Sequence, residues 1–318
     1  MKVMRLAGSA QESRLIETDV PQPGPQQGEV LVRVRAAGVT ATELGWYPTS
    51  HTKTGQARPG AVPSHEFSGD VAELSGGVAG FSIGQPVYGM NDWFADGALA
   101  EFCVTQPDWI APKPESLSYA EAASVPIGAL TAWQGLFGRA MLQPGERVLV
   151  HGGAGGVGVF AIQLAHRHGA HVITTVSAHN FEFAKQLGAD QVIDYHAARF
   201  DENVRDIDVV FDGVGGDTLR RSWTVLRPGG RLVTIAAGGE TATDERARQA
   251  FFIVEPGRQQ LVEIGRLLDA GELRPVVDTV VPFSQASEAY TATFKKRGRG
   301  KLVIAVTELE RGASGLPG

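Results

Sequence analysis

The most specific chemical pattern in the chain is a set of three glycines at Gly153, Gly155 and Gly158. The spacing G-x-G-x-x-G is typical of a turn that binds the pyrophosphate of a dinucleotide. Glycine permits the tight turn, lets backbone N–H groups approach the phosphates, and lets the next helix pack closely on the preceding strand. The partial positive charge at the start of that helix would face the phosphates. We therefore predict a dinucleotide site here, with Gly156 and Val157 completing the turn.

The segments that flank the glycines favour the same interpretation. Residues 148–150 form an apolar run that predicts a buried strand, and residues 159–168 carry apolar side chains at helical spacing. Gly169 follows as a stop signal for the helix. Because strand, glycine turn and helix succeed one another, dinucleotide binding is preferred to an ordinary glycine-rich turn.

Strands and helices alternate beyond this unit. We expect strands at 171–176, 192–193, 207–211 and 231–236, with helices at 181–187 and 258–270. Such alternation predicts a parallel sheet that helices cover on both faces. Before residue 120 the pattern is of strands and turns, clearest in the alternating segment 29–36.

The composition narrows the class of protein. A chain of 318 residues predicts two domains, and a net charge of −6 argues against nucleic-acid binding. No apolar run reaches the length of a membrane span. Cys103 is the single cysteine, which excludes a disulfide framework or a cysteine cluster for zinc. The first residues lack the apolar core of a signal peptide, so we expect a cytoplasmic protein.

Short motifs spread over the chain resemble those of the medium-chain dehydrogenase/reductase superfamily. The general ones are residues 152–158, 187–195, 211–216 and 226–233. Residues 36–40, 122–126, 130–133 and 299–303 are similar to the zinc-independent quinone oxidoreductase branch, which includes zeta-crystallin-like proteins. The resemblance covers residues 1 to about 307.

The resemblance implies an α/β protein with two domains. A GroES-like, β-rich catalytic domain would comprise residues 1–122 and 273–318. A Rossmann domain with a doubly wound parallel sheet would comprise residues 123–272 and bind NADP(H). The resemblance also implies a cleft between the domains, where nicotinamide meets a small-molecule substrate, and commonly a homodimer. No nucleic-acid or membrane partner is expected.

This sequence departs from the zinc-containing members of the superfamily at the metal ligands. Thr40 stands where they have a ligand cysteine, and Ile127 stands at about the position of their third ligand. Their His-Glu pair is kept as His65 and Glu66. Because catalytic zinc needs three protein ligands and an open position, we predict no metal site. The retained pair leaves open the alternative of a zinc-type alcohol dehydrogenase with atypical ligands.

The missing ligands indicate which reaction is feasible. Hydride transfer to an isolated ketone leaves a localised alkoxide that needs a Lewis acid or a good proton donor. Hydride addition to a quinone or an enone spreads the charge, so a few hydrogen-bond donors suffice. We therefore expect an NADPH-dependent reductase of quinones or other α,β-unsaturated carbonyl compounds, with Thr40, Tyr47 and His65 as candidate donors. Tyr47 is alternatively an aromatic residue of the cleft, and the chain alternatively a non-catalytic NADPH-binding protein.

The choice of cofactor is predicted from Ser177, at the end of the second strand of the dinucleotide unit. NAD-specific domains carry a carboxylate there, about 20 residues beyond the glycines. Serine does not repel a 2′-phosphate and can donate to it, which favours NADPH. His179 and Tyr195 are further candidates at that end, although relatives often add a lysine or arginine just after the serine and none follows here. The remaining cofactor candidates, whose alternative roles are helix capping and loop or core packing, are Thr131, Val214, Gly238, Phe252 and Ile253.

Overall fold

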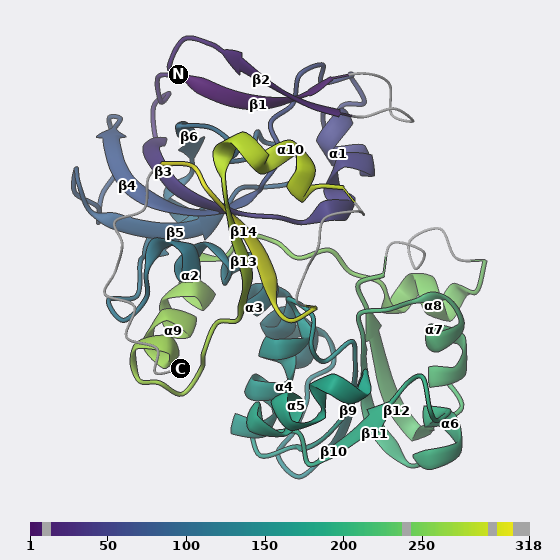
Figure 1. Ribbon diagram of the computed structural model, residues 1–318. Coiled ribbons are helices and arrows are strands. Elements are labelled where there is room, and N and C mark those ends of the chain that lie inside the picture. Colours follow the sequence, from purple (N-terminus) through teal and green to yellow (C-terminus); the bar gives the residue numbers. More distant parts are fainter. Residues whose placement is uncertain (8–13, 237–242, 292–297, 308–318) are drawn as a thin grey trace.

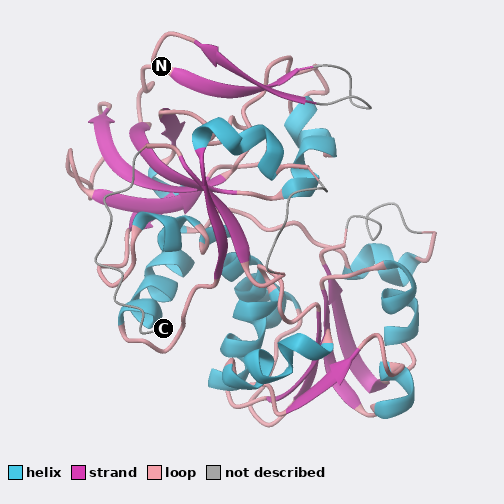
Figure 2. Ribbon diagram, viewed as in Figure 1, coloured by secondary structure: helices cyan, strands magenta, loops and turns pink. Residues whose placement is uncertain are grey.

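The computed structural model describes residues 1–7, 14–236, 243–291 and 298–307, whose strands form three sheets (Figures 1 and 2). The smallest sheet is a hairpin of β1 (Lys2–Ala7) and β2 (Arg14–Asp19), which lies beside the N-terminus. Within these ranges no helix combines the length and the apolar character that crossing a membrane requires.

The largest sheet has seven strands in the order β13-β14-β3-β4-β5-β7, with β6 paired to β3. Their bounds are β3 (Val30–Gly38), β4 (Glu66–Leu74), β5 (Pro86–Met90), β6 (Phe102–Thr105), β7 (Ile110–Pro112), β13 (Val277–Pro282) and β14 (Lys301–Ala305). The alternation predicted for residues 29–36 corresponds to β3, whose inward valines are fully buried. Because β14 pairs with β3, the C-terminal segment completes a sheet begun near the N-terminus.

The other large sheet has five parallel strands in the order β10-β9-β8-β11-β12. They are β8 (Arg147–His151), β9 (His171–Val176), β10 (Gln191–Asp194), β11 (Ile207–Asp212) and β12 (Leu226–Thr234). The strand order reverses between β8 and β11. In open parallel sheets ligands bind at such a switch point, outside the carboxyl ends of the strands.

Helices cover both large sheets and fill the junction between them (Figure 1). Those around the parallel sheet are α4 (Gly158–Arg167), α5 (Phe181–Gln186), α6 (Phe200–Asn203), α7 (Gly216–Ser222) and α8 (Glu245–Ala250). The others are α1 (Tyr47–Ser50), α2 (Tyr119–Ala123), α3 (Pro126–Trp133), α9 (Arg258–Asp269) and α10 (Ala286–Ala289). A π-helical turn, Gln134–Arg139, extends α3, and α9 packs on both α3 and β7. The α/β class expected from the sequence is confirmed.

One element differs from the pattern that the sequence suggests. The strand expected at 231–236 begins earlier, because β12 pairs with β11 from Leu226 onward. Its register then jumps, so that Ile207 pairs with Leu226 but Val209 pairs with Arg231. The proline and glycines at 228–230 therefore form an irregularity inside the strand instead of a turn before it.

Candidate active site

The three glycines of the turn after β8 have different surroundings. A Cβ on Gly153 would lie 2.1 Å from Thr174 Oγ1, and one on Gly158 would lie 2.2 Å from the Gly152 carbonyl oxygen. At Gly155 a Cβ would have one atom within 4 Å, the Gly152 carbonyl oxygen at 3.3 Å, so a side chain there would require only a small shift of that carbonyl. Packing thus demands glycine at the first and third positions. The second leaves backbone accessible at the switch point of the sheet, as pyrophosphate binding requires.

The predicted cofactor residues that surround this turn lie at the carboxyl edge of the parallel sheet. Val214, which follows β11, is 55% exposed and lies 3.5 Å from the Cβ position of Gly152. Tyr195, which follows β10, is 58% exposed, and its ring packs against His196 with centroids 4.2 Å apart. Gly238 lies outside the described residues. The roles of all these residues in binding a cofactor stay predictions.

Two buried side chains fix the carboxyl ends of β8 and β11. Asp212 accepts hydrogen bonds from the N–H groups of Val214 and Gly215, each at 3.0 Å, which shapes the loop after β11. His151, its neighbour across the strands, lies between the hydroxyls of Thr175 and Ser222. Burial lowers the pKa of His151 to about 4, although the charge of Asp212 acts in the opposite direction.

Ser177, at the end of β9, has an arginine near it that sequence reasoning missed. Arg299 donates from Nε to Asn180 Oδ1 at 2.6 Å and from Nη2 to the His179 carbonyl at 2.9 Å. Its guanidinium also lies over the Phe183 ring, 4.8 Å from the centroid. Within the described ranges no carboxylate lies within ion-pair distance of this guanidinium. A cation that precedes β14 in the sequence is thus joined to Ser177 through Asn180.

The Asn180 side chain does not cap a helix, although its position suggests that it would. It precedes α5 at the N-cap position, but its side chain makes no capping hydrogen bond. The amide instead accepts from Arg299 and donates to Ser177 Oγ at 3.3 Å. It therefore joins the arginine to the serine.

In the seven-stranded half, His65 is held by oxygen atoms on both sides. Its Nδ1 lies 2.7 Å from Glu43 Oε2, and its Nε2 lies 3.2 Å from the Ala95 carbonyl oxygen. Glu43 also accepts from the Tyr290 hydroxyl at 2.7 Å and from the Ser64 N–H at 3.1 Å. His65 and Glu43 are fully enclosed, and burial raises the pKa of the Tyr290 hydroxyl. Both nitrogens of His65 thus face oxygen atoms of the protein, and because both oxygens only accept, each of these contacts needs an N–H on the ring.

Thr40 belongs to a second buried group. Lys301 Nζ lies 3.3 Å from Thr40 Oγ1 and 2.5 Å from Glu66 Oε1. The other oxygen of Glu66 accepts from the Ile127 N–H at 2.9 Å. Burial raises the pKa of Glu66, and the Lys301 charge partly offsets that shift. Neither Lys301 nor Glu43 was among the residues predicted from the sequence, because each acts through contacts with distant segments.

Aromatic residues adjoin these groups. Trp93 packs against both Trp46 and His65 at centroid distances of 4.9 Å, and its Nε1 donates to the Val254 carbonyl at 3.0 Å. Tyr47, by contrast, is 55% exposed, and its ring stacks on His51 at 4.3 Å. The structure therefore groups Thr40 and His65 with the buried networks and leaves Tyr47 at the surface.

The other residues expected near the cofactor lie along α3 and the segment that leads to α9. The Thr131 hydroxyl donates to the Ile127 carbonyl at 2.6 Å, inside α3, so it does not cap the start of that helix. Phe252 is buried against the π-helical turn, next to Gly135, whereas Ile253 is 40% exposed. Their contacts with a cofactor stay predictions.

The zinc site that the superfamily implies does not fit these residues. An oxygen atom of the protein lies against each ring nitrogen of His65, Thr40 Oγ1 contacts an ammonium group, and the Ile127 side chain offers only hydrocarbon. Across the described residues, no cluster of three or more His, Cys, Asp or Glu side chains could hold a metal ion.

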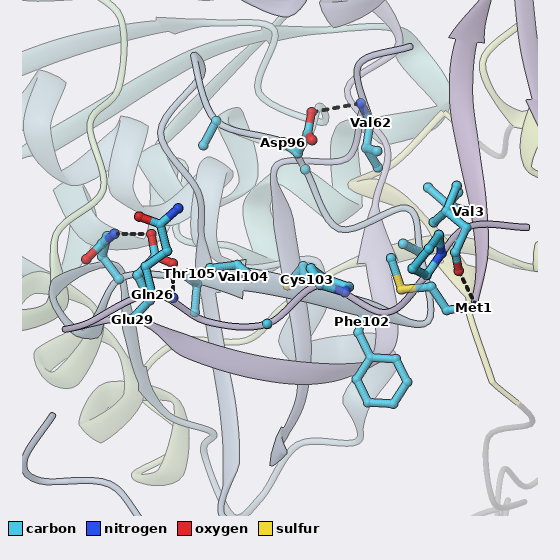
Figure 3. Close-up of a pocket in the computed structure, with 18 of the residues that line it drawn as sticks. Met1, Val3, Gln26, Glu29, Val62, Asp96, Phe102, Cys103, Val104 and Thr105 are labelled. Atoms are coloured by element: carbon cyan, nitrogen blue, oxygen red, sulfur yellow. Dashed lines mark hydrogen bonds between the residues drawn. The ribbon is translucent and has the colours of Figure 1, made fainter. Parts of the chain in front are cut away.

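Two hollows are found outside these networks. One of about 520 Å³ lies along β6, between Phe102 and the connector at Gln26 and Glu29 (Figure 3). The other, of about 610 Å³, includes Phe252 and Ile253. Thr40, Tyr47 and His65 line neither.

Comparison with known proteins agrees with this architecture. The model of the alcohol dehydrogenase GroES-like domain matches residues 26–115, and that of the zinc-binding dehydrogenases matches residues 187–304. The mitochondrial NAD(P)H oxidoreductase RTN4IP1 of Danio rerio is 31% identical, over 88% of this chain and 84% of the relative. The 2-methylene-furan-3-one reductase of Solanum lycopersicum is 33% identical, over 91% of this chain and 74% of the relative.

Solved structures extend the likeness to three dimensions. The quinone oxidoreductase of Coxiella burnetii is 32% identical and superposes with a TM-score of 0.85, over 96% of this chain and 99% of that one. Likeness of sequence and fold thus covers the GroES-like and Rossmann-type halves together. The chain belongs to the medium-chain dehydrogenase/reductase superfamily of oxidoreductases, in its quinone oxidoreductase-like branch.

Proposed function

We propose that the protein is an NADPH-dependent reductase of quinones or other α,β-unsaturated carbonyl compounds, and that it works without zinc. One observation carries the proposal: the three positions that would hold zinc are engaged with other protein groups. Glu43 and the Ala95 carbonyl hold His65, and Lys301 lies against Thr40. Ile127 contributes only its N–H, to Glu66.

The acceptor class is inferred from the zinc positions, which other protein groups occupy. Hydride addition to a conjugated carbonyl places the negative charge on an enolate or hydroquinone oxygen and delocalises it. A positioned hydroxyl donor is then sufficient, whereas an isolated alkoxide would need a metal or a strong acid. The cofactor supplies the hydride, and the residues of this chain orient the cofactor and stabilise the oxyanion. The names of the relatives, a furanone reductase and quinone oxidoreductases, support this class.

NADPH is proposed over NADH because of the charges near Ser177. A serine and a guanidinium that has no carboxylate partner among the described residues suit a 2′-phosphate, since arginine and phosphate form strong charge-assisted hydrogen bonds. Arg299 is already oriented by Asn180 and the His179 carbonyl, so little freedom would be lost on binding. The nearby His179 ring, whose Nε2 lies 3.4 Å from Ser177 Oγ, adds a further polar group.

A panel of acceptors tests the function. Purified protein is mixed with NADPH or NADH and with 9,10-phenanthrenequinone, simple enones, enoyl thioesters or ketones, and separately with NADP+ or NAD+ and simple alcohols, and absorbance at 340 nm is followed. We expect NADPH oxidation with quinones or enones and none with isolated ketones. Turnover of simple alcohols or ketones would favour the zinc-type alcohol dehydrogenase. Tight NADPH binding without turnover of any acceptor would favour a non-catalytic binding protein.

Three further predictions accompany this function. The boundaries at 122/123 and 272/273 would separate the two domains, the protein would form a homodimer, and it would be cytoplasmic. Light scattering coupled to gel filtration measures the oligomeric state. A monomer at micromolar concentration would contradict the dimer.

A further inference from the structure

Three polar side chains form a row that leads from the core to the junction between the two halves. Glu66 is fully buried, Lys301 is 9% exposed and Thr40 is half-buried. The ammonium group of Lys301 lies between the other two, 2.5 Å from Glu66 Oε1 and 3.3 Å from Thr40 Oγ1.

The strand order explains why the three residues meet. Thr40 follows the end of β3, while Glu66 begins β4 and Lys301 begins β14, and both of these strands run antiparallel to β3. Gly38 makes room for the carboxylate, since a Cβ there would lie 2.5 Å from Glu66 Oε1. Lys301 also adjoins the glycine turn, because its Cε would lie 3.5 Å from a Cβ on Gly156.

The chemistry of an ammonium group fixes the direction of these hydrogen bonds. An ammonium only donates, so Thr40 Oγ1 accepts from Lys301 and the hydroxyl hydrogen must point elsewhere. A hydroxyl that accepts from a charged donor is itself polarised into a better donor. Among the candidate donors, His65 has both nitrogens engaged within the protein and Tyr47 is 55% exposed on its stack with His51.

We infer that the Thr40 hydroxyl donates to the carbonyl oxygen of the acceptor, and that Lys301, held by Glu66, is the positioning residue that orients and polarises it. This inference rests on the proposed function. A bound nicotinamide would supply the hydride, with both electrons, to the conjugated carbon, and the negative charge would then fall on the carbonyl oxygen. Thr40 stabilises that oxyanion without giving up its proton. Solvent water supplies the proton that completes the product.

A double-mutant cycle tests the inference. Hydride-transfer rates are measured in single turnovers at saturating NADPH, and NADPH affinity is measured separately by fluorescence titration. Thr40→Val should lower the hydride-transfer rate roughly ten- to a hundredfold with NADPH affinity unchanged, whereas Thr40→Ser should keep most of the rate. Lys301→Met should lower the rate in the wild-type background and have no further effect in a Thr40→Val background.

Two further variants control for loss of activity through misfolding. Lys301→Met leaves Glu66 buried without its partner, so the combination with Glu66→Gln removes both charges and is tested in the same cycle. Lys301→Arg should rescue part of the rate. Thermal unfolding of each variant shows whether the fold is kept.

The outcomes separate this inference from the function on which it rests. A wild-type protein that reduces no acceptor with NADPH overturns both. An active wild type with an unaffected Thr40→Val variant overturns the inference alone. So does a Lys301→Met effect that is equal in both backgrounds or confined to NADPH affinity, because Lys301 would then act on the cofactor and not through Thr40.

Discussion

The glycine turn after β8 and the His65 network differ in whether their polar groups are paired within the protein. At the turn, Gly155 leaves backbone free of side chains, and at the nearby end of β9 Arg299 carries a charge without a carboxylate partner among the described residues. Around His65, carboxylate, imidazole, hydroxyl and carbonyl groups bind one another inside the protein. In the first region, polar groups stay open to a ligand. In the second, the polar groups are paired with one another.

The comparison predicts that substitutions in the His65 network act mainly on stability. Glu43→Ala should lower the free energy of unfolding by roughly 3–5 kcal/mol, because His65, Tyr290 and the Ser64 N–H lose the buried carboxylate that accepts from them. Urea denaturation measures the loss. Glu17→Ala, which breaks the exposed pair with Lys2, serves as the control and should cost less than about 1 kcal/mol. An equal, small effect of both substitutions would mean that the buried network contributes little.

A second buried histidine, His151, sharpens the contrast, because its hydrogen-bond partners are the Thr175 and Ser222 hydroxyls, and the nearby Asp212 carboxylate bonds to the loop after β11 instead. Its pKa is lowered to about 4 by burial, so the folded protein resists protonation that the unfolded chain accepts at about 6.5. Stability is therefore complete above pH 6.5 and falls as the pH drops towards 4. The loss is on the order of 3 kcal/mol.

Urea denaturation between pH 7.5 and 4.5 checks this prediction. The His151→Gln variant should lose less stability over that range than the wild type, while His196→Gln at the exposed loop should behave as the wild type. Parallel pH curves for wild type and His151→Gln would contradict the assignment.

In the glycine turn, substitutions should act on the ligand instead. Gly155→Val should weaken NADPH binding roughly a hundredfold by blocking backbone approach to the pyrophosphate, with the fold retained. Gly158→Ala should instead unfold the protein at lower temperature, since its Cβ would lie 2.2 Å from the Gly152 carbonyl oxygen. Fluorescence titration and thermal unfolding separate the two effects. Unchanged NADPH affinity in Gly155→Val would refute the phosphate role of the turn.

The smallest effects should concern the choice between the two cofactors. Arg299→Ala should lower kcat/KM for NADPH roughly tenfold and leave that for NADH unchanged, because only NADPH carries the 2′-phosphate. Ser177→Asp should also lower the ratio of kcat/KM for NADPH to that for NADH, because it adds a negative charge. The matched control is Arg258→Ala, because the Arg258 guanidinium also stacks on an aromatic ring, that of Phe81. A wild type that prefers NADH would show that this corner does not bind the phosphate.

The two regions also differ in how far the sequence alone describes them. The glycine turn is predictable because its strand, glycines and helix are consecutive in the sequence. The spacing of the glycines therefore indicates the local geometry. The networks around His65 and Thr40 depend on Tyr290 and Lys301, which lie 247 and 261 residues from their partners Glu43 and Thr40. Arg299 likewise reaches Asn180 across 119 residues. Local sequence patterns do not reveal such contacts, which form when the C-terminal segment packs on the rest of the fold, as β14 does on β3.

The central claim is that reduction proceeds without zinc, and metal content measured together with turnover tests it most directly. The purified protein is dialysed against a strong chelator, its zinc is determined by elemental analysis, and NADPH oxidation with the best quinone or enone acceptor is measured before and after. The account predicts full activity with far less than one zinc per chain. One tightly held zinc per chain, with activity that disappears on its removal and returns on its addition, would contradict it.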